Sequence, residues 1–516
     1  MARQVLQQDK RALMLTQTPG KLMMSLSLPA IVGMAVIGLY TFMDAVYAGQ
    51  LIGMEAMGAV AVAYPFTFIN SGGASMIGMG SASVLSRAIG AKDQRTIDQV
   101  MGNLVVMNLV LSLTVTIVGT VFARPLLALT GAQGQVLDLA ESYLRIMLVG
   151  SLFVNFAQSS NMVMRGKGEL ARAMAIMGGG AVLNMVLAPL FILALRDQGL
   201  GIQGAGCATV ITQMIQAGVM LWWFVKREKT ARIVRVAVSP AILPEVLKVG
   251  ASAMLMQVLV LVQQAIAYRA AAAWGGAEWQ VLLGAALRIQ AFAFIPLWGM
   301  SNGLQPAAGT NYGAGLYGRV RKLTIVFCLG SMALALLFWV PAMLAPEATL
   351  SLLVSDPAVA AMGADDFRVF FSTYLVAGPM VMGITLLQAL GQGGKAAILT
   401  FARPVALFVP LVLILPNVAG LGIHGVWAAS ALSDGVMIVV AAFMVASVIR
   451  NLGKDEGSAA DRVTMEEEAA RAYRAGAPPS CRCRLARASC RRYPRRAGSA
   501  TVPRIRHHEQ TARCFT

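Results

Sequence analysis

The sequence predicts an all-α polytopic membrane protein with twelve transmembrane helices in two pseudo-symmetric six-helix lobes. Three observations lead to this fold class. Of the 516 residues, 57% are hydrophobic and 13% are charged, whereas a soluble domain carries roughly 25% charged residues. The apolar residues form runs of about twenty or more, the length that a helix needs to cross a membrane. One segment also occurs twice along the chain, which indicates two related halves.

Twelve apolar stretches follow one another along the chain, separated by short polar breaks. They lie at 22–48, 56–82, 99–122, 136–160, 170–194, 203–225, 245–272, 280–304, 322–342, 367–390, 396–416 and 423–449. Basic residues gather in alternate connections, for example Arg87, Arg165, Lys226 and Arg319. Because cytoplasmic loops carry an excess of Lys and Arg, we expect a multi-pass protein of the plasma (inner) membrane with both termini in the cytoplasm.

The repeat sets the predicted domain boundaries. The string GLGIQGAGCAT at 199–209 returns as GLGIHGVWAAS at 420–430, with six of eleven positions identical. Each half then holds six spans and begins and ends on the same side of the membrane, so an axis along the membrane normal should relate the halves. The predicted parts are a cytoplasmic N-terminal segment 1–20, a first lobe 21–226, a cytoplasmic linker 227–243, a second lobe 244–450 and a basic tail 451–516.

The tail changes in composition after about Tyr473, where Arg, Cys and Pro become frequent. Its candidate metal ligands are Cys481, Cys483, Cys490, His507 and His508. They lack the paired cysteine spacing of zinc sites, so we predict no metal site. We interpret this segment as out-of-frame translation of the gene end. A disordered basic tail close to anionic lipid is the alternative interpretation.

The membrane body is poor in residues for catalysis, so we expect neither enzyme activity nor a cofactor. No GxxxxGK[ST] loop is present, so the sequence implies neither an ATP site nor an ATPase partner. His424 is the only histidine before the tail, and we expect it to be solvated in an outer loop. The net charge of +18 lies in alternate loops and in the tail, which reflects membrane topology rather than nucleic-acid binding. We expect a monomer.

Asp44 is the strongest candidate for a functional residue. It lies near the outer end of the first span, after Pro29, which removes a helical hydrogen bond and should act as a hinge. A carboxylate within a membrane must be paired, protonated or exposed to water, and it is a functional candidate by default. The repeat places Ala265 at the equivalent position of the second half, so the acid is confined to one lobe. An interfacial acid at a helix end is the alternative.

Other polar residues within the predicted spans are Asn184, Thr209, Arg288 and Asp434. Each could simply form hydrogen bonds with a neighbouring helix. Arg288 and Asp434 both lie in the second half and could pair with each other.

Several methionine and aromatic side chains of the first half could line a pocket for varied substrates. As candidate substrate contacts we name Met34, Tyr40 and Tyr143. Residues of these types at helical spacing are more often packed in the protein or exposed to lipid, which is the alternative interpretation.

Over residues 20–450 the sequence resembles the multidrug and toxic compound extrusion (MATE) transporters. The most specific motif is RIQAFAFIPLWGMSNGLQPAAGTNYGAG at 288–315. In the first half the matching motifs are LPAIVGM, YTFMDAVYAG, SRAIGAKD and RGKG. The resemblance implies a cation-coupled antiporter that exports organic, often cationic, compounds in exchange for protons or sodium by alternating access.

The resemblance also implies a cation-coupling site in the first lobe. Carried over by motif, its members are Asp44, Asn184, the backbone of Ala205, and Thr209. The sequence departs from the family at Ala188, which stands where an acidic or amide ligand is usual. Because sodium needs several oxygen ligands and a proton needs one, this departure favours proton coupling. The alternative is a lipid-linked oligosaccharide flippase of the same superfamily, whose more cationic cavity would need more intramembrane arginines.

Overall fold

The computed structural model describes residues 12–47, 51–129, 133–196, 198, 200–228, 231, 233, 236–354, 356–418 and 420–474. In these residues the regular structure is helical and no strand is present. The chain divides into a unit Met1–Ser447 and a unit Val448–Thr516. The second unit is described as the backbone of the end of helix α18 up to Arg474. The possible metal ligands of the predicted tail lie outside the described residues.

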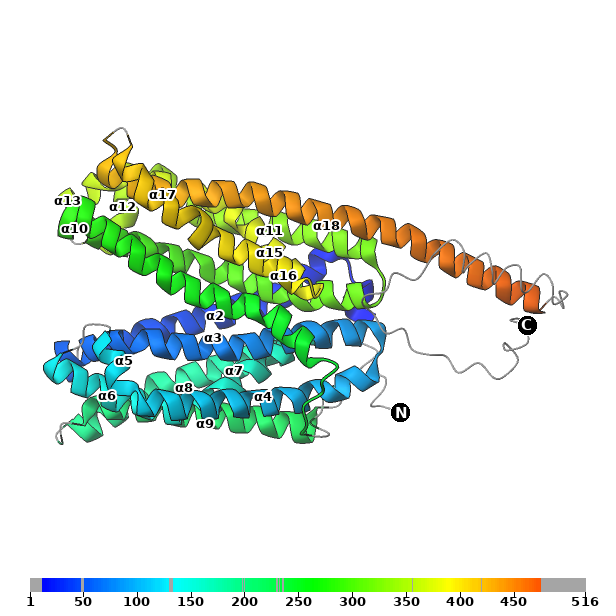
Figure 1. Cartoon of the computed structure of the whole chain (residues 1–516), viewed down its shortest axis with the longest axis horizontal. Helices are drawn as coiled ribbons and strands as arrows, with labels where there is room; N and C mark the ends of the chain where they lie inside the picture. Colours follow the sequence, from blue (N-terminus) through cyan, green and yellow to red (C-terminus); the bar gives the residue numbers. More distant parts are fainter. Residues whose placement is uncertain are drawn as a thin grey trace. The chain divides into compact units, whose positions relative to one another are not determined.

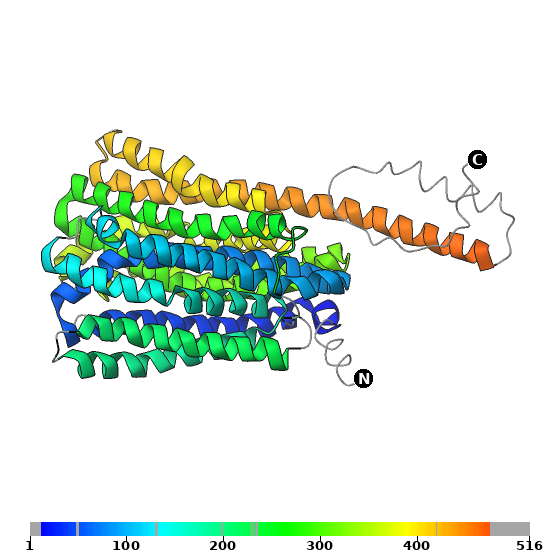
Figure 2. The same cartoon turned by 60° about the horizontal axis from the view of Figure 1, so that its bottom comes forward.

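The helices of the first half gather on one side of the first unit and those of the second half on the other (Figure 1). In Figure 2 they run side by side along one common direction, as expected of a membrane bundle. The first half contains α2 (Pro19–Tyr47), α3 (Met54–Ala91), α4 (Gln94–Val121), α5 (Ala123–Leu129), α6 (Gly134–Val149), α7 (Ser151–Gly166), α8 (Leu170–Arg196), α9 (Gly201–Trp222) and the π-helical turn η2 (Trp223–Arg227).

The second half begins with the longest helix of the described chain. Its elements are α10 (Leu243–Gly313), α11 (Tyr317–Leu344), α12 (Pro346–Leu350), α13 (Pro357–Met362), α14 (Ala364–Ser372), α15 (Tyr374–Ala389), α16 (Gly393–Phe401), the π-helical η3 (Ala402–Phe408), α17 (Val409–Ile414), the 3₁₀ turn η4 (Leu415–Asn417) and α18 (Gly422–Arg474). The helix α18 runs on through the first part of the segment that was predicted as a tail.

Nine described helices are long and apolar enough to cross a membrane, which confirms a polytopic helical fold. One of them, α10, contains two predicted spans, and its backbone leaves the helical region at Gly276, with φ 76° and ψ −161°. Glycine adopts a positive φ without the steric cost that a side chain would bring, so Gly276 permits the chain to reverse between these spans. The count of twelve spans stays a prediction.

The two halves meet where α10 packs against α3 and α2. The backbones approach closely because glycines stand at the contact: a Cβ atom on Gly80 would lie 2.1 Å from the carbonyl oxygen of Val246, and one on Gly250 would lie 1.9 Å from that of Met76. Small residues permit this kind of helix contact in membranes.

The dipeptide Gly-Ala follows the second predicted span of each half, at 90–91 and at 313–314, and its two glycines face one another at this contact. A Cβ atom on Gly90 would lie 2.9 Å from the Cα atom of Gly313. Equivalent positions of two related halves meet in this way when they lie beside the axis that relates them. The contact therefore agrees with the pseudo-symmetric lobes predicted from the sequence.

We predict that Gly80→Ala lowers the thermal stability of the purified protein, whereas Gly218→Ala does not. The new methyl group at Gly80 would meet backbone atoms, which cannot move aside, and overpacking of this kind costs about 1–3 kcal/mol. Gly218 is a matched control on α9, because a Cβ atom there would meet nothing within 4 Å. Thermal unfolding in detergent checks this. Equal midpoints for the two variants would contradict a tight contact at Gly80.

Candidate functional site

Three of the four residues predicted for cation coupling lie together between α8 and α9. Asn184 and Thr209 are 3% and 7% exposed. The amide of Asn184 donates a hydrogen bond to the Thr209 hydroxyl at 3.3 Å, and this hydroxyl donates to the carbonyl of Ala205 at 3.1 Å. The carbonyl oxygen of the Asn184 side chain is buried and has no hydrogen-bond partner among the described residues. Within the described residues, the site therefore keeps one unused acceptor.

The fourth predicted residue, Asp44, is on α2, and its side chain lies outside the described part of the structure. Helix α2 packs against α8, where Gly33 approaches Met174. The predicted hinge Pro29 lies inside α2, which continues past it as one helix. The roles of Asp44 and Pro29 stay predictions.

The residue Ala188 lies one turn beyond Asn184 on α8 and is 1% exposed. A buried methyl group at this position supplies no oxygen ligand. At this position the structure therefore supplies no oxygen atom to the surroundings of Asn184 and Thr209.

The predicted substrate contacts lie in other surroundings. Tyr143 is 7% exposed and belongs to an apolar cluster with Leu127, Leu144 and Leu148, so it serves packing there. Met34 and Tyr40 are half-buried on α2. None of the three lines the cavity in the second half, and their contact with substrate stays a prediction.

The suggested pair of Arg288 and Asp434 is wrong. Arg288 is exposed on α10, whereas the carboxylate of Asp434 on α18 is paired with Arg403 of η3. The guanidinium and the carboxylate meet through two hydrogen bonds, from Nε to Oδ1 and from Nη2 to Oδ2, the second at 3.2 Å. Two opposite charges that share two hydrogen bonds satisfy one another, which explains why the half-buried Arg403 and the buried Asp434 are tolerated within the bundle.

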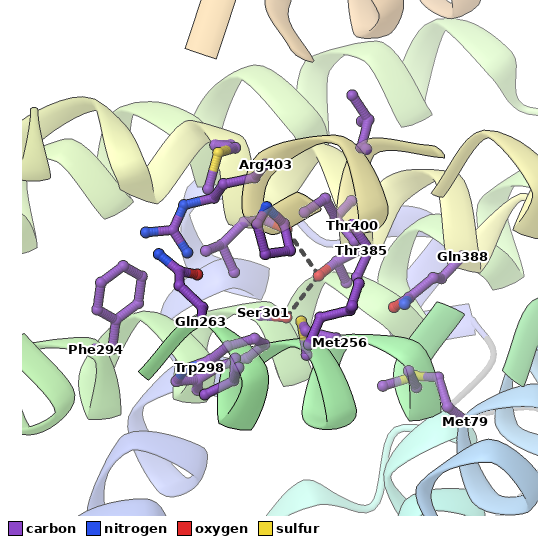
Figure 3. A pocket seen from close by; sticks show the side chains of 18 of the residues that line it. Met79, Met256, Gln263, Phe294, Trp298, Ser301, Thr385, Gln388, Thr400 and Arg403 are labelled. Carbon is purple, nitrogen blue, oxygen red and sulfur yellow. Dashed lines mark hydrogen bonds between the residues drawn. The ribbon is translucent and has the colours of Figure 1, made fainter. Parts of the chain in front are cut away.

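Arg403 also lines a cavity of about 140 Å³ in the second half. Figure 3 shows its guanidinium on the same side as the Gln263 amide, with Phe294 and Trp298 nearby. The walls come from both spans of α10, from α15 and from α16 with η3. They are completed by Met79 of α3. The hydroxyls of Ser301 and Thr385, which also line the cavity, form a hydrogen bond of 2.6 Å with one another.

Sequence reasoning missed Arg403, although its signal is visible. An arginine within the apolar run TFARPVALFVP is costly in a membrane unless it has a partner or reaches water. It also missed the environment of His424. The side chain is 60% exposed, as expected, yet its Nδ1 lies 2.8 Å from Oδ2 of Asp366, and its ring stands edge-on to Trp279.

Polar contacts join the two halves near the predicted cytoplasmic end. Nη1 of Arg87 on α3 lies 2.5 Å from Oε1 of Glu245 on α10. The Ser83 hydroxyl donates to the carbonyl of Gln388 at 2.5 Å, and the Gln388 amide donates to the Ser252 hydroxyl at 2.9 Å. These bonds connect α3, α10 and α15, so separation of the halves at this end would break them.

A buried ion cluster holds the start of the linker against the RGKG loop. Nζ of Lys167 contacts the carboxylate of Glu228 and lies 3.3 Å from that of Glu169. The indole of Trp223 donates to Glu228 at 3.2 Å. Beside them, burial lowers the pKa of the Arg165 guanidinium to about 10, which still leaves it charged at neutral pH. The cluster therefore holds the chain in place where the first lobe ends and the linker begins.

The MatE family model matches residues 29–190 and 252–414, one stretch in each half. The chain belongs to the MATE family. This MATE protein is similar to the multidrug export protein MepA of Staphylococcus haemolyticus, with 24% identity over 442 residues that cover 85% of this chain and 96% of the relative. It is therefore a multi-pass membrane protein of a multidrug efflux transporter family.

Two further relatives show the range of this similarity. The FAD transporter of Shewanella oneidensis is 24% identical and covers 76% of this MATE protein and 87% of its own chain. The solved structure of MATE in the bent conformation has a TM-score of 0.81 at 26% identity, with 87% of this chain and 99% of that chain covered.

We predict that Thr209→Val destabilises the protein more than Thr324→Val does, by about 1 kcal/mol. Thr209 links α8 to α9, and its loss leaves the Asn184 amide unpaired in a buried place, which costs about 1–3 kcal/mol. Thr324 is a matched control because its hydroxyl donates only to the Val320 carbonyl of its own helix. Thermal unfolding of both purified variants checks this. Equal losses would contradict the cross-helix bond.

Proposed function

We propose that this MATE protein exports organic, often cationic, compounds in exchange for protons, by alternating access of its two lobes. The observation that carries the proposal is the buried Asn184–Thr209–Ala205 cluster, with its unused acceptor, beside the helix that bears Asp44. The similarity to a protein named for multidrug export supports the substrate class.

Proton coupling is favoured over sodium coupling by the oxygen atoms around this cluster. The hydroxyl of Thr209 and the carbonyl of Ala205 are bonded to one another, and Ala188 offers a methyl group. A sodium ion needs several oxygen ligands at once, whereas one carboxylate is enough to carry a proton. We therefore assign the coupling to protonation of Asp44.

The proposed cycle lets the drug and the proton compete for one state of the first lobe. With Asp44 ionised, the outward-facing lobe holds a cation. Protonation from outside removes that charge, and Pro29 lets α2 change its bend as the drug leaves. A ligand shifts such an equilibrium only by its difference in affinity for the two states. The inward-facing state further requires that the contact of Arg87 with Glu245 opens.

The alternative, a flippase for lipid-linked oligosaccharides, calls for an excess of positive charge in the central cavity. Arg403 is the arginine that lines the second-half cavity, and Asp434 neutralises it. One arginine that is already paired with an acid is less positive charge than a flippase cavity calls for, so it favours the multidrug exporter over the flippase.

We predict that Asp44→Asn abolishes proton-driven uptake of a fluorescent organic cation into liposomes. In these liposomes the protein is inserted with its cytoplasmic side facing outward, so that export is measured as uptake. The amide cannot take up and release a proton, while its size is unchanged. Asp98→Asn is the matched control, because Asp98 accepts a hydrogen bond from the neighbouring Gln94 on the surface of α4 and should retain transport. Full activity of Asp44→Asn would falsify the coupling role.

We predict that a proton gradient drives this uptake and that a sodium gradient alone does not. The reason is the missing oxygen ligand at Ala188. The measurement imposes each gradient separately on the same liposomes. Sodium-driven uptake would refute the assignment to protons, and absence of uptake under both gradients would favour the flippase.

A further inference from the structure

The second-half cavity contains polar groups that no described part of the protein uses. Gln263 and Asn302 line it from the two spans of α10, and neither side-chain amide forms a hydrogen bond with another described residue. Their neighbours on the walls are apolar or aromatic, including Phe294 and Trp298. Convergent polar groups in a mainly apolar cavity are typical of a small-molecule site.

Arg403 presents one edge of its guanidinium to the same space. Nε and Nη2 are engaged by Asp434, whereas Nη1 makes no hydrogen bond within the described chain. The arginine lies in the π-helical segment η3, next to Pro404. π-helical turns occur frequently at functional sites. Asp434, which holds the other edge, is not part of the cavity wall.

The charge of the cavity wall fits an acceptor rather than a cation. No Asp or Glu is among its described lining residues, and Arg403 is the charged group there. Nη1 offers two N–H donors, and the Gln263 and Asn302 amides can donate as well. The polar part of a ligand at this place is therefore an oxygen acceptor, and a carboxylate would gain most from the guanidinium.

The apolar part of the ligand is set by volume and by the aromatic walls. An apolar cavity of roughly 150 Å³ accepts benzene, and this one measures about 140 Å³. Phe294 and Trp298 supply faces and edges for an aromatic ring. Space for one ring next to Nη1 of Arg403 fits an aromatic acid.

We propose that the second-half cavity is a binding site for aromatic carboxylates, with the acid group on Nη1 of Arg403 and the ring beside Trp298. This inference rests on the proposed function in one respect, namely that ligands of the cavity are transported. Asp434 acts as a positioning residue: it holds the guanidinium edge-on to the cavity and offsets its charge, so that the bound acid can also leave.

The test compares benzoate with benzamide, which is similar in shape and uncharged. Ligand-observed saturation-transfer NMR titrations on the full chain in nanodiscs give both dissociation constants, with empty nanodiscs as background. We expect benzoate to bind about tenfold more tightly, because hydrogen bonds to charged groups are the stronger ones. Equal affinity of the two compounds for the parent protein would overturn the proposal without need of any variant.

Variants then test whether Arg403 causes the preference for benzoate over benzamide. Arg403→Gln with Asp434→Asn removes both charges together and keeps hydrogen-bonding groups, and it should bind the two compounds equally. Arg288→Gln removes an arginine of the same lobe outside the cavity and should keep the tenfold preference. Asp434→Asn alone keeps an oxygen acceptor that holds the guanidinium and removes the charge that offsets it, so this variant should strengthen benzoate binding. A preference retained in the double variant, or weaker benzoate binding in Asp434→Asn, would overturn the assignment.

This binding experiment uses no ion gradient. Its outcome is therefore independent of whether Asp44 couples transport to protons. Absence of proton-driven uptake by the parent protein, with an intact preference for benzoate, would remove the proposed coupling and leave the site. Proton-driven uptake without a preference for benzoate would remove the site alone.

Discussion

The close contact of α3 with α10 is the constraint on which the rest of the first unit depends. At Gly80 and Gly250 the two backbones approach so closely that a single methyl group would clash with a carbonyl oxygen. In lipid the hydrophobic effect does not drive helices together, so van der Waals contact and hydrogen bonds must do so. Because α3 belongs to one half and α10 to the other, this contact positions the first-half cluster and the second-half cavity within one molecule.

The polar interior follows one rule on both sides of this contact. Charges and amides within an apolar bundle are stable where they meet partners, as Arg403 meets Asp434 and Asn184 meets Thr209. Candidate sites are distinguished by polar groups that have no hydrogen-bond partner within the described chain. These groups are the side-chain carbonyl oxygen of Asn184 in the first half and Nη1 of Arg403 in the second half. The two halves thus offer ligands opposite polarity, an acceptor in the first and donors in the second.

The sequence predicted the helical membrane fold. Through its family motifs it also predicted the grouping of Asn184, Ala205 and Thr209. It failed for the pairing of side chains between helices. Arg288 was paired with Asp434 because both are polar and in the same half, yet Arg403, 31 residues from Asp434, occupies that place. The exposure of His424 was expected, whereas its contact with Asp366, 58 residues away, was not.

By itself the sequence determined the class of protein, because the length and polarity of its runs dictate which segments cross a membrane, and it determined the internal repeat. Tertiary structure alone decided how charges pair, which helices meet, and where space remains. Hydropathy is a property of segments and can be read locally. Pairing and cavities depend on the rotation of each helix about its axis, which is fixed only by packing against the others.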